Sequence, residues 1–188
     1  MIANHGGQAI LTSLDHQTGT DRVYEVFKNE LRNEPSLIIN LQGDMPNIDP
    51  KAISDLALYM KKGKCDIGTL ASKFVSEEEL TDENNVKVAV KEKIESGNFG
   101  KAVDFFRTSS NIYENIYHHV GIYAFTNKSL VRYVSLERSK LELERKLEQL
   151  RALENDISIH VGYIKSSPLS VDTKNDLIEV KKIMENNE

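Results

Sequence analysis

The sequence predicts a single α/β domain, covering residues 1–188, that is built on a mixed β-sheet. Short apolar runs typical of buried strands alternate with segments whose apolar residues recur at helical spacing, which is the pattern of an α/β protein. Two strand-like segments in the middle of the chain flank Ser96-Gly97-Asn98, and a hairpin at this point makes the sheet mixed. The chain of 188 residues is long enough for one hydrophobic core.

The expected strands are apolar runs bounded by turn residues. They lie at residues 9–11, 37–41, 67–71, 86–90, 102–106, 119–125 and 157–164. Apolar and polar residues alternate in the segment 86–90, which predicts a half-exposed strand with 102–106 as its hairpin partner.

The expected helices begin at capping residues or proline and end near glycine or proline. A helix tail at residues 1–8 ends at Gly6-Gly7, and further helices are expected from Thr20 to before Pro35, from Pro50 to Lys62, from Ser135 to Leu153 and from Thr173 to Met184.

The predicted helix at 135–153 carries an apolar stripe among charged residues. Leu136, Leu143 and Leu150 recur at sevenfold spacing with Leu147 between them. The stripe predicts a surface helix packed on the sheet. A dimer seam is the alternative, although the stripe is short for a coiled coil, which needs three or four sustained heptads.

Composition excludes several classes of protein. A net charge of −5 argues against a nucleic-acid binder, whose footprint is a basic patch. No apolar run has the length of a membrane span, and no signal sequence opens the chain. Cys65 is the only cysteine, so neither an intrachain disulfide nor a cysteine-cluster metal site can form. We therefore expect a soluble cytoplasmic protein.

The segment Asn40–Asp49 is the most informative part of the chain. It follows the apolar run Leu37–Ile39 and contains Asp44 in a Gln-Gly-Asp turn. Open α/β sheets place their ligands at the carboxyl ends of strands, and a carboxylate there suits Mg²⁺ with a nucleotide phosphate. Asp172 also follows an extended segment and precedes a helix. Both residues have an alternative role, Asp44 in binding its own turn and Asp172 as an N-cap.

A polar cluster, Asp15–Arg22, lies between an expected strand and an expected helix. It can bind a base or a phosphate, because a helix N-terminus favours anions. The alternative, which the local pattern favours, is a capped turn with Asp21 compensating the helix dipole. His118 and His119 lie at a strand start, where at most one of them is expected to point into a given cleft.

Six segments, taken together and in order, resemble the 3-deoxy-manno-octulosonate (Kdo) cytidylyltransferase family of the sugar nucleotidyltransferase superfamily. They are DHQTGTDR (15–22), NLQGDMP (40–46), NVKVAV (85–90), HVGIYAF (119–125), LEQLRALE (147–154) and SVDTKNDL (170–177). The resemblance implies a Rossmann-like nucleotide-diphospho-sugar transferase fold with a mostly parallel sheet and an inserted hairpin. It also implies a Mg²⁺-dependent homodimer that transfers CMP from CTP to Kdo, releasing pyrophosphate, for lipopolysaccharide synthesis.

The resemblance assigns roles to single residues. It implies that Asp44 and Asp172 bind Mg²⁺, and that Arg107 pairs with the Kdo carboxylate. The residues matched to the neighbourhood of the cytidine are Thr18, Gly19, Thr20, Asp21 and Arg22. Gln42 matches a position beside substrate, and the positions lining the sugar-acid pocket are His119, Tyr123, Glu148 and Gln149.

The sequence departs from the family's pattern in two places. A basic phosphate loop of the kind Pro-x-Arg-x-x-Ser-x-Arg does not occur before Asp15, and the loop after Asp104–Arg107 lacks the family's proline. An N-terminally truncated, poorly stable enzyme is therefore expected, because a missing central strand would leave a sheet edge unpaired. A non-catalytic binding or dimerisation module and a synthetase acting on a sialic acid are the alternatives.

Overall fold

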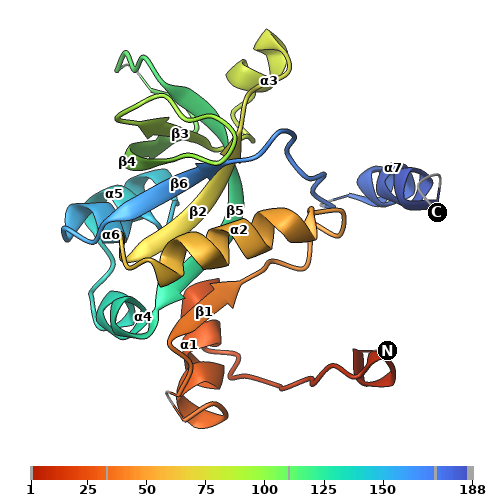
Figure 1. Cartoon of the computed structure of the whole chain (residues 1–188), viewed down its shortest axis with the longest axis vertical. Coiled ribbons are helices and arrows are strands. Elements are labelled where there is room, and N and C mark those ends of the chain that lie inside the picture. The colour runs from red at the N-terminus through yellow and green to blue at the C-terminus, as the bar shows by residue number, and fades with distance from the viewer. Residues whose placement is uncertain (1, 33, 110, 172, 186–188) are drawn as a thin grey trace.

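The computed structural model describes residues 2–32, 34–109, 111–171 and 173–185. These residues form one mixed β-sheet with helices on both of its faces (Figure 1). The α/β class and the mixed sheet predicted from the sequence are confirmed. The described helices include none with both the length and the apolar character that a membrane crossing requires.

The described strands follow the order β1-β5-β2-β6-β4-β3, and β3 also pairs with β5. Their bounds are β1 Leu37–Asn40, β2 Ile67–Ser72, β3 Lys87–Val90, β4 Phe99–Phe106, β5 Ile116–Thr126 and β6 Ile159–Tyr163. Only the β2–β6 pairing among these strands is parallel. The expectation of a mostly parallel sheet is therefore wrong for the described strands, because β5 runs antiparallel to all three of its neighbours.

Seven α-helices and one short 3₁₀ helix lie in the described part of the chain. Their bounds are η1 Ile2–His5, α1 Gly19–Asn29, α2 Pro50–Lys61, α3 Glu77–Thr81, α4 Asn127–Val134, α5 Lys140–Arg145, α6 Leu150–Glu154 and α7 Lys174–Glu185. The predicted helix tail at the start is confirmed as a single 3₁₀ turn, which ends at His5 and is followed by Gly6 with φ +79°. The sequence predicted neither α3 nor α4.

The capping predictions hold with small shifts. Thr18, rather than Thr20, is the N-cap of α1, and it forms a capping box with Asp21. Asp49 caps α2, with Pro50 as the first helical residue. Both helices therefore begin where local chemistry satisfies their first backbone N–H groups.

The core has two layers, one on each face of the sheet. On one face, Leu56 and Met60 of α2 pack on Ile122 of β5. On the other face, Phe27 of α1 and Leu130 of α4 pack with the strands. The sheet therefore lies between α2 on one face and α1 and α4 on the other.

Two strand predictions are wrong. Residues 9–11 form no strand in the described chain, since they find no partner strand, and Leu11 is 99% exposed. The strand β3 is fully buried rather than half exposed, because its alternating polar residue, Lys87, is only 2% exposed. The Lys87 ammonium donates to the backbone carbonyls of Asp82 (2.5 Å) and Asn85 (3.1 Å), which is what allows it to lie inside.

The predicted helix at 135–153 is also wrong, because the segment folds as α5 and α6 joined by an elbow. Lys146 adopts a left-handed conformation (φ +54°), which breaks the helix. Arg151 of α6 folds back on Glu142 of α5, with Nε to Oε2 2.8 Å and Nη2 to Oε1 2.6 Å. Glu142 is fully buried, so two residues that suggested a solvated face lie in the interior.

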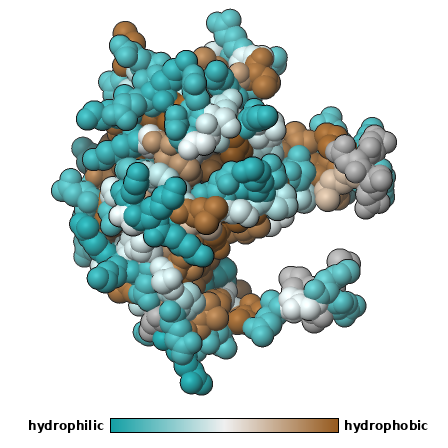
Figure 2. Space-filling view, in the orientation of Figure 1, coloured by the Kyte–Doolittle hydropathy of each residue, from teal (hydrophilic) through white to brown (hydrophobic). Residues whose placement is uncertain are grey.

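Two segments project from the body of the molecule on the same side. Figure 1 shows the N-terminal segment and α7 extending away from the sheet. Four apolar side chains of α7 are exposed: Leu177, Ile178, Ile183 and Met184. Figure 2 shows further apolar residues gathered in the recess between α2 and α1, next to the edge strand β1.

Candidate active site

A cleft opens at the middle of β5, where the strands on one side of it separate. β3 pairs with β5 at residues 116–118, and β1 pairs with it at 123–126. The side chain of Gln42, which follows β1, lies here over Gly121, where an added Cβ would meet Gln42 Nε2 at 3.4 Å. The cleft has a volume of about 550 Å³ and is lined by Gln42, Asp44, Met45, Lys73, Val75, Glu79, Asn84, Asn85, His118, His119, Val120, Gly121 and residues 166–170.

Asp44 brings a carboxylate into this cleft. Its Oδ1 is buried and has no hydrogen-bond partner among the described residues. The backbone carbonyl of Asp44 accepts a hydrogen bond from Val171 N at 2.9 Å, and Asn47 Oδ1 accepts one from Leu169 N at 2.9 Å. These contacts bring the segment before Asp172 against the Asp44 turn, whereas Asp172 itself lies outside the described residues.

His119 lies at the floor of the cleft and is buried. Its Nε2 lies 2.9 Å from Thr69 Oγ1, and its ring contacts Phe105 edge to face and Tyr123. Burial lowers the pKa of His119 to about 3, with a smaller effect from the neighbouring His118. The imidazole is therefore neutral at physiological pH.

His118 also lines the cleft, whereas the expectation that at most one of the two histidines points into it stays a prediction. His118 Nδ1 lies 2.7 Å from Glu79 Oε1, and its ring stacks on Phe74. His119 instead contacts Thr69, so the two neighbouring histidines have different partners.

Four other predicted residues meet beside the cleft rather than in it. They are Thr20, Tyr123, Glu148 and Gln149, and they line a cavity of about 10 Å³ whose remaining walls are mostly apolar. Thr20 donates from Oγ1 to Glu148 Oε1 at 3.0 Å, whereas Glu148 Oε2 is buried without a partner in the described chain. Burial raises the pKa of Glu148 and raises that of Tyr123 well above its ordinary value. The Tyr123 ring contacts His119 and so connects this cavity to the cleft.

The segment 18–22 forms the capped turn that its local pattern favoured. Thr18 and Asp21 bind each other across the first turn of α1, which begins at Gly19. Arg22 Nη1 donates to the backbone carbonyl of Ser13 at 2.9 Å and to Thr12 Oγ1. The polar cluster therefore joins the start of α1 to the segment before it.

Arg107 does not line the cleft. It donates from Nη1 to the backbone carbonyls of Glu83 (3.2 Å) and Asn84. These contacts hold the segment that carries Asn84 and Asn85 into the cleft wall. Arg107 is thus bound to a segment of the cleft wall, and its pairing with the substrate carboxylate stays a prediction.

The sequence did not identify five polar residues of the cleft wall: Lys73, Glu79, Asn84, Ser166 and Ser167. Glu79 lies in α3 and the others lie in connecting segments, and no motif places these parts of the chain beside β5. Asn85 was visible only as the first residue of the segment 85–90, and its role in the wall comes from the fold.

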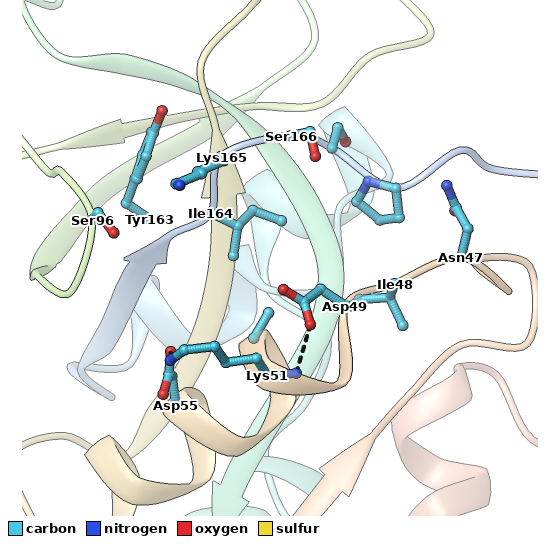
Figure 3. Close-up of a pocket in the computed structure, with 13 residues that line it drawn as sticks. Asn47, Ile48, Asp49, Lys51, Asp55, Ser96, Tyr163, Ile164, Lys165 and Ser166 are labelled. Atoms are coloured by element: carbon cyan, nitrogen blue, oxygen red, sulfur yellow. Dashed lines mark hydrogen bonds and ion pairs between the residues drawn. The ribbon is translucent and has the colours of Figure 1, made fainter. Parts of the chain in front are cut away.

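A second cavity, of about 350 Å³, lies at the N-terminus of α2 (Figure 3). Asp49 caps the helix there by accepting from Lys51 N at 2.8 Å, and the Lys51 ammonium pairs with Asp55 at 2.6 Å. None of the residues that the sequence predicted for the site lines this cavity.

Comparison with known proteins decides the family. Residues 1–159 match the family model described as cytidylyltransferase. A 3-deoxy-manno-octulosonate cytidylyltransferase of Brucella ovis (strain ATCC 25840 / 63/290 / NCTC 10512) is 41% identical over 179 residues, covering 94% of this chain and 71% of that protein. The chain belongs to the 3-deoxy-manno-octulosonate cytidylyltransferase family. The corresponding enzyme of Bartonella tribocorum (strain CIP 105476 / IBS 506) is 39% identical and covers 97% of this chain and 75% of that protein.

Solved structures agree with membership of the Kdo cytidylyltransferase family. A CMP:2-keto-3-deoxy-manno-octonic acid synthetase complexed with CTP matches with a TM-score of 0.86 and 32% identity, covering 100% of this chain and 76% of that chain. A 4-diphosphocytidyl-2C-methyl-D-erythritol synthase from Anaerococcus prevotii, at a TM-score of 0.57 and 14% identity, shares the fold alone. The resemblance stated from the sequence is confirmed, and so is the nucleotide-sugar transferase type of fold.

Proposed function

We propose that this protein transfers CMP from CTP to the anomeric hydroxyl of Kdo and releases pyrophosphate. Two observations support the proposal: membership of the Kdo cytidylyltransferase family and the cleft beside β5. The observation that carries it is Asp44 Oδ1, a carboxylate oxygen that is buried in this cleft without a partner among the described residues. An orphaned carboxylate oxygen is costly unless a ligand completes it.

The donors present fit Mg²⁺, and we propose Asp44 and Asp172 as its protein ligands. Mg²⁺ is bound in proteins by one or two carboxylates together with substrate phosphates and water. The hydrogen bond from Val171 N to Asp44 O brings Asp44 next to the residue that precedes Asp172 in the sequence. When bound, the metal would supply charge neutralisation at the phosphates.

The other residues of the cleft would bind and orient the two substrates. Lys73 provides a cation for an anionic ligand, and Gln42 and His119 provide hydrogen-bonding groups to a sugar. We retain Tyr123, Glu148 and Gln149 as residues of the sugar-acid side, since they line one cavity and the Tyr123 ring contacts His119. The role of 18–22 beside the cytidine remains a proposal from the resemblance.

The pairing of Arg107 with the Kdo carboxylate is proposed from the resemblance, and the contacts of Arg107 with the carbonyls of Glu83 and Asn84 hold the adjoining wall segment. A homodimer, a cytoplasmic location, a role in lipopolysaccharide synthesis and the absence of a nucleic-acid partner are also proposed from the resemblance. Sedimentation velocity of the purified chain tests the first of these proposals directly.

The function is tested by following pyrophosphate release from CTP, Kdo and MgCl₂. We expect release that requires all three components and that falls at least about a hundredfold in D44N, in line with the loss of electrostatic stabilisation at a reacting group. The matched control is D55N, because Asp55 is an exposed partner of Lys51 outside the cleft. No release from the wild-type chain, or equal release from D44N, would contradict the proposal. Equal turnover with a sialic acid would point to the synthetase alternative.

A further inference from the structure

A β-bulge in β5 gives Thr69 a role that its burial alone does not explain. Thr69 pairs with Tyr123, but the next residue, Leu70, pairs with Val120. Residues 121 and 122 of β5 therefore have no paired residue in β2. Bulges re-aim side chains and carbonyls, and they are common next to active sites. At this bulge, the carbonyl oxygens of Val120 and Ile122 both turn toward the Thr69 hydroxyl.

The distances fix where the Thr69 hydroxyl proton points. Thr69 Oγ1 lies 2.7 Å from Ile122 O and 3.2 Å from Val120 O. A carbonyl oxygen only accepts, so the single hydroxyl proton is donated to this pair, most strongly to Ile122. The third neighbour of Oγ1 is His119 Nε2 at 2.9 Å, and this contact must therefore be one in which the hydroxyl accepts.

The tautomer of His119 follows from this assignment. His119 Nε2 carries the proton that it donates to Thr69, so Nδ1 of the neutral ring carries a lone pair. In the described part of the chain, Nδ1 has no hydrogen-bond partner. Two aromatic rings pack against the imidazole, Phe105 edge to face and Tyr123 at a tilt, and His119 lines the cleft.

We propose that Thr69 is a positioning residue that holds His119 as a neutral, Nε2-protonated ring, so that its Nδ1 accepts a hydrogen bond from a hydroxyl of the sugar substrate. A lone pair repels a carboxylate, so this part of the cleft binds the hydroxyl-bearing portion of the substrate, and its carboxylate binds elsewhere. The identity of the ligand rests on the proposed function, whereas the assignment of the tautomer does not.

The tautomer is tested by long-range ¹H–¹⁵N NMR on the chain labelled at histidine, at pH 7.5, with H119N used to assign the signal. We expect an Nε2-protonated His119 in the wild type and in T69S, which keeps the hydroxyl. In T69V, which removes it, we expect a mixture of tautomers. The signals of His118 and His160, held by Glu79 and Tyr59, report whether each variant keeps its fold.

The acceptor role is tested by titrating the same samples with Kdo and, separately, with CTP. We expect Kdo to shift the His119 Nδ1 signal and to bind about tenfold more weakly to T69V than to T69S, as for one hydrogen bond. The affinity for CTP should stay within about twofold in both variants, since no nucleotide contact is assigned to Thr69.

An Nδ1-protonated His119 in the wild type would overturn the assignment. Equal Kdo affinity in T69V and T69S would overturn the positioning role. If Kdo does not bind to the wild-type chain while the tautomer is as expected, the hydroxyl-acceptor role and the proposed function both fail, and the Thr69–His119 pairing stands.

Discussion

The buried ion pair in the α5–α6 elbow makes a sharp prediction about stability. Glu142 is fully buried, and it accepts from Arg151 through both of its carboxylate oxygens. The guanidinium carbon of Arg151 also lies 4.7 Å from the centroid of the Tyr133 ring. Burial opposes ionisation of Glu142, but the hydrogen bonds from Arg151, Arg138 and Ser139 N outweigh it and lower its pKa. R151M would leave this carboxylate charged, buried and deprived of its main partner.

The expected cost of R151M lies at the lower end of the range for breaking a buried pair. Removing one partner of such a pair costs about 3–5 kcal/mol, mainly because an uncompensated charge remains. Arg138 Nε still donates to Glu142 Oε1 at 3.0 Å and compensates part of this charge. We therefore expect a loss of about 3 kcal/mol, which in a domain of this size lowers Tm by roughly 6–12 °C.

Urea unfolding and thermal melts of R151M measure this loss. The matched control is K140M, which breaks the exposed Lys140–Glu144 contact of the same helix (3.8 Å) and should cost less than about 0.5 kcal/mol. The double variant E142L/R151M should recover most of the stability, since it leaves no buried charge. A loss below about 1 kcal/mol in R151M, or a double variant as unstable as the single one, would refute the reasoning.

Two further predictions concern the sheet. The pKa of His119 is lowered to about 3 in the folded protein, so its contribution to stability is fully present above the unfolded-state pKa near 6.5 and falls by about 1.4 kcal/mol per pH unit below that pKa. Urea unfolding between pH 7 and 4.5 should therefore show a smaller loss of unfolding free energy in H119N than in the wild type. Equal pH slopes of the unfolding free energy in the two proteins would contradict this. G162A should cost about 2 kcal/mol by overpacking, because its Cβ would lie 2.5 Å from Phe99 Cε1, in a ring stacked on Tyr59. Its control, G43A, meets nothing within 4 Å, and urea unfolding that finds the two variants equally stable would count against the packing argument.

The parts of the fold that the sequence could predict are those with local causes. The helix α2 follows from Asp49, Pro50 and an apolar spacing that is decided within a few residues. The hairpin of β3 and β4 follows from a short turn between two apolar runs, and the pairing is confirmed. The residues at the ends of such elements determine where they begin and end, so their prediction needs no knowledge of tertiary contacts.

The elbow between α5 and α6 could not be predicted, because its cause is tertiary. The left-handed Lys146 is unfavourable by itself, and Arg151 reaches Glu142 only because the chain has already turned there. In the sequence, the two charges suggested a solvated helix face. The turn has a consequence for the site, since Tyr133 OH donates to the backbone carbonyl of Glu148 at 2.7 Å and fixes this residue just after the elbow.

In the candidate site too, some features have local causes in the sequence and others depend on tertiary contacts. Asp44 could be predicted, since a strand followed by a Gly-Asp turn places a carboxylate at a strand end. The burial of its Oδ1, which has no partner among the described residues, could not be predicted, because it depends on how distant segments such as the one that contains Val171 pack against the turn.

His119 makes the limit of sequence reasoning plain. Alternation along a strand predicts that neighbouring residues face opposite ways, and this holds for His118 and His119. Alternation cannot predict that both residues line one cleft, because the cleft lies where β1 and β3 pair with different parts of β5. Nor can it predict the tautomer, which depends on a bulge that turns the Ile122 carbonyl toward Thr69. A residue type at a strand start therefore locates a candidate, and the backbone geometry around it decides whether that candidate donates a proton or accepts one.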